Sequence, residues 1–103
     1  MARESETTFL IESYVPQLDE RVAITISARL REAIGDLEEE GVALRWRGSF
    51  ALVEEETYLC LVVAPDRECV LLLNQRAALA SDHVAAIVTI DAPSDSDRIV
   101  GFS

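Results

Sequence analysis

The residues best suited to chemistry lie where the sequence pattern predicts strands. Glu12 stands inside the run F-L-I-E-S-Y-V, which is otherwise apolar or aromatic apart from one serine. A carboxylate in such a strand is expected to be desolvated, and a desolvated carboxylate is a stronger base, suited to general acid or base work. The alternative is structural, with Glu12 paired to an arginine and serving only to fix a contact between chains. Glu12 is therefore the candidate catalytic residue.

Two arginines and two tyrosines are the candidate ligand-binding residues. Arg45 and Arg47 alternate with Trp46, so both are expected on the strand face opposite the indole. If that face is the open side of a sheet, they would clamp a carboxylate bidentately; otherwise their charges keep an edge strand from pairing with other chains. Tyr14 shares the predicted strand face of the glutamate, and Tyr58 is expected to offer its hydroxyl to the same interior.

The remaining reactive side chains form no catalytic arrangement. Cys60 and Cys69 have neither a C-x-x-C spacing nor a nearby histidine pair, which predicts two buried free thiols. His83, the single histidine, precedes the last predicted strand and is expected to face solvent. No serine stands in a recognisable triad order, and the four glycines form no phosphate-binding loop. We therefore expect no cofactor and no metal.

Composition excludes several classes of partner. The chain has 103 residues with 19 acidic and nine basic side chains, a net charge of −10, and every basic residue is an arginine. Nucleic acids and anionic membranes require a basic patch, so neither is an expected partner. The longest apolar run, 58–64, is too short to span a bilayer, and the first residues lack a signal-peptide core. With 50% hydrophobic residues, the sequence predicts a folded, soluble, cytoplasmic protein.

Strand and helix patterns alternate along the chain. Strands are predicted over 7–15, 42–53, 58–64 and 84–90, where β-branched and aromatic residues gather. One helix is predicted between an Asp19 cap and a Gly41 stop, and a second over 67–80 after Pro65 and Asp66. The first carries an apolar stripe at spacings of three and four: Val22, Ile26, Leu30, Ala33 and Leu37. Strict alternation in the second strand predicts one face with Leu44, Trp46, Phe50 and Leu52.

The order β-α-β-β-α-β predicts an α+β protein of the ferredoxin-like type. Right-handed crossovers then place the first and third strands at the centre of a four-stranded antiparallel sheet, with both helices on one face. We expect a flexible N-terminus over 1–6, this domain over 7–91, and a polar spacer with a C-terminal tail over 92–103. The tail is expected either to dock as an extra strand or to remain loose.

The predicted sheet leaves apolar side chains without cover. Two helices cover one face only, yet the first, third and fourth strands carry large apolar residues on both faces: Phe9 and Ile11 against Leu10 and Tyr14, and Leu59, Leu61 and Val63 against Tyr58, Cys60 and Val62. Exposed aliphatic surface of that extent is uncommon on a monomer. We therefore expect a homodimer, sheet against sheet, as in dimeric α+β barrels.

Five short motifs carry a resemblance to a known family. The sequences F-L-I-E-S-Y-V-P, W-R-G-S-F, T-Y-L-C, A-P-D-R-E-C-V and D-H-V, within residues 8–90, resemble the small actinobacterial ferredoxin-like proteins that include a nickel-binding protein. The resemblance implies a compact dimer with a sheet-lined interior and, in some members, metal held by histidines. At two positions where the family commonly has histidine this sequence has Gly48 and Leu73, so the metal ligands are not retained.

Two classes of function follow. The first is a non-catalytic dimer that binds a small apolar or acidic ligand, or a protein partner, between the sheets. The second is a cofactor-free enzyme similar to muconolactone isomerases or small quinone-forming monooxygenases, with Glu12 as base and Arg45 or Arg47 orienting an anionic substrate. Nickel binding, implied by the resemblance, is a weaker third hypothesis.

Overall fold

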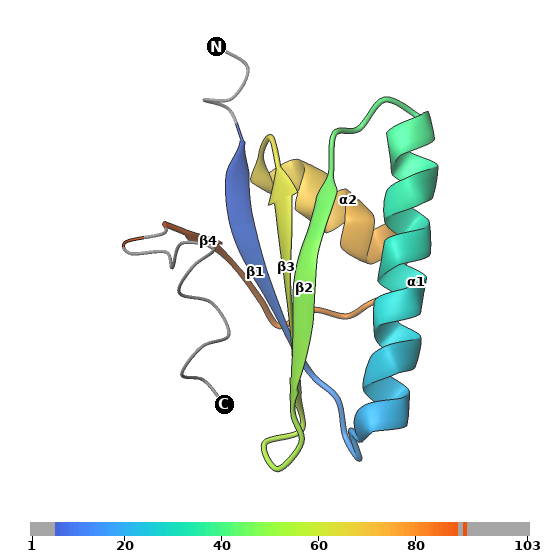
Figure 1. Cartoon of the computed structure of the whole chain (residues 1–103), viewed down its shortest axis with the longest axis vertical. Helices are drawn as coiled ribbons and strands as arrows, with labels where there is room; N and C mark the ends of the chain where they lie inside the picture. Colours follow the sequence, from blue (N-terminus) through green and yellow to red (C-terminus); the bar gives the residue numbers. More distant parts are fainter. Residues whose placement is uncertain (1–5, 89, 91–103) are drawn as a thin grey trace, which may run out of the picture.

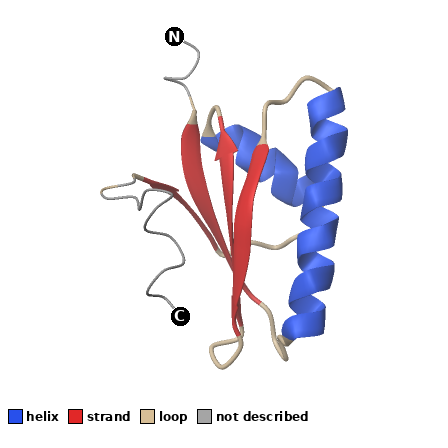
Figure 2. Cartoon of the chain, in the orientation of Figure 1, coloured by secondary structure: helices blue, strands red, loops and turns tan. Residues whose placement is uncertain are grey.

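Four strands and two helices alternate in the part of the chain that the computed structural model describes, residues 6–88 and residue 90. They are β1 (Thr7–Tyr14), α1 (Glu20–Glu39), β2 (Arg45–Leu52), β3 (Thr57–Ala64), α2 (Arg67–Arg76) and β4 (His83–Ile87). The strands form one antiparallel sheet in the order β2-β3-β1-β4. Both helices lie on the same face of the sheet (Figures 1 and 2). This is the ferredoxin-like α+β fold predicted above, whereas the predictions for 1–5 and 92–103 fall outside the described residues.

Helix α1 begins and ends at the signals that the sequence contains. The Val22 backbone N–H donates to the Asp19 carboxylate at 2.8 Å, which satisfies one of the free N–H groups of the first turn. At the other end Gly41 adopts a φ of 95°, in the left-handed region, and its N–H donates to the Glu38 carbonyl while the Val42 N–H donates to Leu37. These two bonds form a Schellman motif, the common way in which glycine ends a helix.

Helix α2 starts as predicted and ends earlier than predicted. The Asp66 carboxylate accepts from the Cys69 N–H at 3.0 Å. The helix stops at Arg76 rather than Ala80, because Ala78 takes a φ of 57° in the place where a helix stop usually has glycine. The Arg29 guanidinium on α1 donates to the carbonyls of Ala77 and Ala78, at 3.0 and 3.1 Å, and stabilises this end. A contact between helices thus replaces the missing glycine signal.

The hydrophobic core lies between the two helices and the face of the sheet that they cover. Alternate residues of β1 and β3 enter it, as a half-buried strand requires. Its members in the sheet include Phe9, Ile11, Tyr58, Cys60 and Val62, and its members in the helices include Ile26, Leu30, Leu37, Val70 and Leu73. Their neighbours along β1 and β3 therefore point to the opposite face, which carries no helix.

The strict alternation predicted for the second strand is wrong. The register of β2 against β3 shifts between Trp46 and Gly48, where Arg47 forms a bulge and Gly48 has a φ of 142°. After the bulge every side chain changes face. Trp46 packs against the core together with Ala51, whereas Phe50 lies on the helix-free side, 55% exposed. The bulge thus moves apolar side chains out of the core and onto the exposed face.

The register defines the surface that we call the helix-free face. Residues opposite one another across neighbouring strands share a face, so the rows of the sheet can be read from the pairing. Its members are Arg45, Gly48, Phe50 and Leu52 on β2, Thr57, Leu59, Leu61 and Val63 on β3, Thr8, Leu10, Glu12 and Tyr14 on β1, and His83, Ala85 and Ile87 on β4.

Candidate functional site

Glu12 lies on the helix-free face, directly opposite a histidine. Its backbone pairs with Leu59 of β3 on one side and with His83 of β4 on the other. Glu12 is half-buried and His83 is exposed. Directly opposed residues on antiparallel strands hold their Cβ atoms about 5 Å apart, so the carboxylate and the imidazole are within reach of one another. The two side chains are therefore neighbours on the face, although no hydrogen bond or ion pair joins them among the described residues, and His83 belongs to β4 rather than to a preceding loop.

The two arginines do not join this pair within one chain. Arg45 pairs with Val63, which pairs in turn with Thr8, four residues before Glu12 on β1. Four residues of strand and two strand spacings amount to about 13 Å and about 10 Å respectively. The Arg45 guanidinium lies instead 3.5 Å from the Glu6 carboxylate. The predicted arginine clamp around Glu12 is therefore not assembled by a single chain.

Arg47 and Tyr14 are both exposed, and among the described residues neither forms a hydrogen bond or an ion pair with the Glu12 side chain. Arg47 is the bulge residue of β2 and has no strand partner. Tyr14 lies on the helix-free face, 58% exposed, and its hydroxyl donates to the Glu56 carboxylate at 2.9 Å. This hydrogen bond, together with the charge of Glu56, raises the pKa of the Tyr14 phenol. Tyr14 therefore connects the end of β1 to the turn before β3.

Tyr58 is not on the helix-free face, contrary to the sequence-based expectation. It is completely buried on the helix side, because strand alternation places it with Cys60 and Val62 under the helices. Its hydroxyl forms a 2.7 Å hydrogen bond with the Ser27 hydroxyl of α1. Burial is the main reason why the pKa of Tyr58 is raised. This phenol belongs to the packing of α1 on the sheet.

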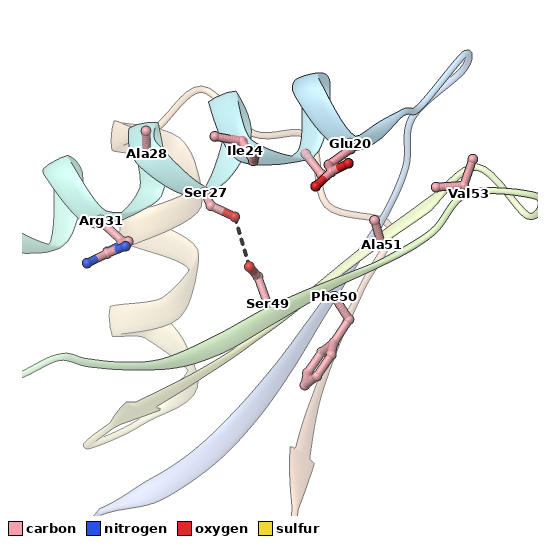
Figure 3. Close-up of a pocket in the computed structure, with 10 residues that line it drawn as sticks. Glu20, Ile24, Ser27, Ala28, Arg31, Ser49, Phe50, Ala51 and Val53 are labelled. Atoms are coloured by element: carbon pink, nitrogen blue, oxygen red, sulfur yellow. Dashed lines mark hydrogen bonds between the residues drawn. The ribbon is translucent and has the colours of Figure 1, made fainter. Parts of the chain in front are cut away.

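A second site lies between α1 and the edge strand β2, and sequence reasoning missed it. The groove there has a volume of about 530 Å³ and is lined by residues of α1 between positions 20 and 31 and by residues 49–51 and 53 in and just after β2. Ser27 and Ser49 point towards one another across its floor, with their hydroxyl oxygens 2.9 Å apart (Figure 3). The signal was present in the small residues Ala23, Ser27 and Ala28 on the flank of α1, beside its apolar stripe.

Both cysteines are free thiols, as predicted, although only one is fully buried. Cys60 has no exposed surface, and burial raises its pKa to about 12. Cys69 is half-buried at the start of α2, and burial together with the nearby Asp66 carboxylate raises its pKa as well. A thiol needs its ionised form to act as a nucleophile. Neither cysteine is therefore activated for catalysis.

The described residues form neither a metal-ligand cluster nor a membrane-spanning helix. Between residues 6 and 90, leaving out residue 89, the structure brings together no cluster of three or more histidine, cysteine, aspartate or glutamate side chains. Neither α1 nor α2 has the length and apolarity that a bilayer-spanning helix requires.

Comparison with known proteins identifies no relative of this chain, since no protein-family model, curated protein or solved structure matches it significantly. The resemblance to the actinobacterial nickel-binding family therefore stays an expectation, and the helix-free face and the α1–β2 groove are the features of the described residues that bear on function.

Proposed function

We propose that this protein is a non-catalytic ligand-binding homodimer whose two chains pack through their helix-free faces. The observation that carries the proposal is the apolar surface at the centre of that face. Leu10, Leu59 and Leu61 occupy the two middle strands and are each only half-buried, while Phe50 and Leu52 on β2 are 55% and 46% exposed. An apolar patch of this kind usually marks an interaction site.

The size of the face fits a second copy of the chain. Four strands of up to eight residues make the sheet. With strands about 4.8 Å apart and about 3.3 Å per residue, such a sheet offers roughly 500 Å² on its face. Two such faces in contact bury roughly 1,000 Å², which is about the smallest area expected of a specific interface. A two-fold axis would place each apolar centre against its own equivalent.

The polar groups of the face are too few and too dispersed for a complete catalytic site in one chain. Glu12 and His83 are adjacent, but Arg45 is several rows away and is paired with Glu6. Electrostatic stabilisation of a developing charge requires donors placed around the reacting atoms. A binding function therefore explains the apolar centre of the face and its few polar groups better than a catalytic function does.

The oligomeric state tests this proposal. Light scattering at micromolar concentration is expected to give twice the 11.4 kDa chain mass, and Leu61→Arg, which places a charge at the centre of the face, is expected to give the single-chain mass. Leu71→Arg, at an exposed leucine of α2, introduces the same charge elsewhere and is expected to leave the dimer intact. A monodisperse wild-type monomer, or equal effects of the two variants, would contradict the proposal.

The Glu12–His83 juxtaposition favours one other candidate, a cofactor-free acid–base enzyme acting on an anionic substrate such as an unsaturated lactone acid. In that case Glu12→Gln would abolish isomerisation of the lactone, followed by its ultraviolet absorbance, while leaving the dimer mass unchanged. No turnover by the wild-type protein would eliminate this candidate and leave the binding protein.

A further inference from the structure

The groove between α1 and β2 combines an apolar wall with a hydroxyl floor. Ile24 of α1 is 61% exposed and Val53, the residue after β2, is 48% exposed, although both line the groove. A volume of about 530 Å³ lies within the range of small-molecule sites, which combine apolar walls with a few polar groups that fix orientation. Phe50 borders the groove only through its position on β2, because its ring points to the other side of the strand (Figure 3). Each chain carries this groove on its helix side, away from the proposed dimer interface.

The hydroxyl floor has one hydrogen more than it uses. Tyr58, Ser27 and Ser49 carry three hydroxyl hydrogens but form two hydrogen bonds with one another, at 2.7 and 2.9 Å. If the completely buried Tyr58 accepted from Ser27, its own O–H would be left with only the Cys60 thiol, a weak acceptor, in the core, and a poorly paired buried donor is costly. Tyr58 therefore donates to Ser27. The remaining hydrogen then belongs to Ser27 or Ser49, and both line the groove.

The charges of the groove stand at its two ends. Glu20 and Arg31 lie eleven residues apart on α1, about 16 Å along the helix axis, and Figure 3 shows them on either side of the serine pair. Within residues 6–88, the Arg31 guanidinium forms neither an ion pair nor a hydrogen bond. A carboxylate is therefore attracted at the Arg31 end and repelled at the Glu20 end.

From these three observations we propose that the α1–β2 groove binds a small amphipathic monocarboxylate. Its carboxylate lies between Arg31 and the serine hydroxyls, and its hydrocarbon part runs along Ile24 towards Val53. This inference rests on the proposed function only in that the protein binds a small ligand; the groove supplies the ligand class, and the site is complete in one chain. A second carboxylate at the far end of the ligand would meet Glu20 and weaken binding.

Calorimetric titration with three ten-carbon probes tests the proposal: decanoate, the neutral 1-decanol and the dicarboxylate sebacate. Decanoate is expected to bind with one molecule per chain and more tightly than either of the others. Amide chemical shifts in NMR spectra are expected to change at Ser27, Ser49 and Ala51. Shift changes confined to Leu10 and Leu61, on the helix-free face, would overturn the proposal, as would the absence of decanoate binding at millimolar concentration.

Matched variants make the test specific. Arg31→Gln is expected to weaken decanoate binding about five- to tenfold, because it removes one partly exposed charge-assisted hydrogen bond to the carboxylate. Arg21→Gln removes the same charge from the same helix outside the groove and is expected to leave binding unchanged. Equal weakening by both variants would show a general charge effect and overturn the site.

The dimer-breaking variant separates this inference from the proposed function. Leu61→Arg is expected to bind decanoate as the wild-type protein does, since the groove needs no second chain. Loss of binding in Leu61→Arg would place the ligand between the sheets and overturn the groove. A wild-type monomer that still binds decanoate through Arg31 would support the groove and contradict the dimer.

Discussion

Ser13 and Tyr58 lie opposite one another on β1 and β3, both completely buried on the helix side of the sheet, yet only one of the two hydroxyls is satisfied. The Tyr58 hydroxyl bonds to Ser27 at 2.7 Å, whereas the Ser13 hydroxyl has no partner within the described chain. A buried polar group without a hydrogen bond costs about 1–3 kcal/mol relative to its solvated state. Within the described residues the core therefore provides a hydrogen-bond partner for the Tyr58 hydroxyl but none for the Ser13 hydroxyl.

Ser13→Ala is expected to stabilise the protein by about 1 kcal/mol, because it removes an unpaired hydroxyl and leaves no new donor behind. Tyr58→Phe is the matched control. It removes a hydroxyl that has a partner and is expected to destabilise the protein by about 1 kcal/mol. The free energy of unfolding in urea measures both changes. Destabilisation by Ser13→Ala would mean that the Ser13 hydroxyl is bonded after all.

Two glycines are expected to respond to alanine in opposite directions. At Gly48 the φ of 142° is strained for any residue with a side chain, although an added Cβ would meet no atom within 4 Å. Gly48→Ala is therefore expected to destabilise the protein by about 1–2 kcal/mol through the backbone of the bulge alone.

Gly35 is the contrasting case, since it lies inside α1 and has the same free space around its Cα. Gly35→Ala is expected to raise the free energy of unfolding by about 0.5–1 kcal/mol, because alanine restricts the unfolded chain and favours helix. Urea unfolding of the pair, compared with the wild-type protein, provides the measurement. A stabilising effect at both positions would show that the β2 bulge is not strained.

Signals that act within a few residues were predictable, and contacts between distant segments were not. The Asp19 and Asp66 caps and the apolar β3 pattern depend on neighbours in the sequence, and the structure confirms them. The faces of β2 depend on how Gly48 pairs with β3. The end of α2 depends on contacts of Arg29 with Ala77 and Ala78.

In the candidate sites, too, single residues could be predicted from the sequence, whereas the neighbours that complete each site could not. The unusual position of Glu12 in an apolar strand was visible in the sequence, whereas its neighbour His83 follows from the strand register. The α1–β2 groove joins Ser27 and Ser49, which lie on separate elements and match no sequence motif. Chemistry carried by one residue can be predicted locally, but an arrangement of several residues requires the fold.

The two thiols are expected to react at very different rates. Cys60 has no exposed surface and a pKa of about 12, so it presents almost no thiolate at pH 8. Cys69 is half-buried and its pKa is also raised, which predicts slow reaction. Titration with a chromogenic disulfide reagent is expected to detect one slow thiol in the native protein and two in guanidinium. Cys69→Ser should abolish the native reaction; its abolition by Cys60→Ser instead would contradict this assignment.

Glu56 is expected to contribute to the loss of stability in acid. Its carboxylate accepts from the Gln17 N–H at 2.7 Å and from the Tyr14 hydroxyl at 2.9 Å, and these bonds hold its pKa below the ordinary 4.5. A group whose pKa is lowered by folding stabilises the protein above its unfolded-state pKa, and this contribution is lost as the pH falls through its folded-state pKa. The contribution of Glu56 is therefore present above about pH 4.5 and disappears below it.

Glu56→Gln keeps an oxygen acceptor but removes the charge, so the melting temperature is expected to be lower at pH 7 and to change less between pH 5 and 3. Glu55→Gln removes the same charge from the same turn and serves as the control. Ultraviolet titration gives a second readout, since the raised pKa of Tyr14 should return towards 10 only when Glu56 is neutralised. If the profiles of Glu56→Gln and the wild-type protein run parallel in acid, the two hydrogen bonds do not stabilise the ionised carboxylate.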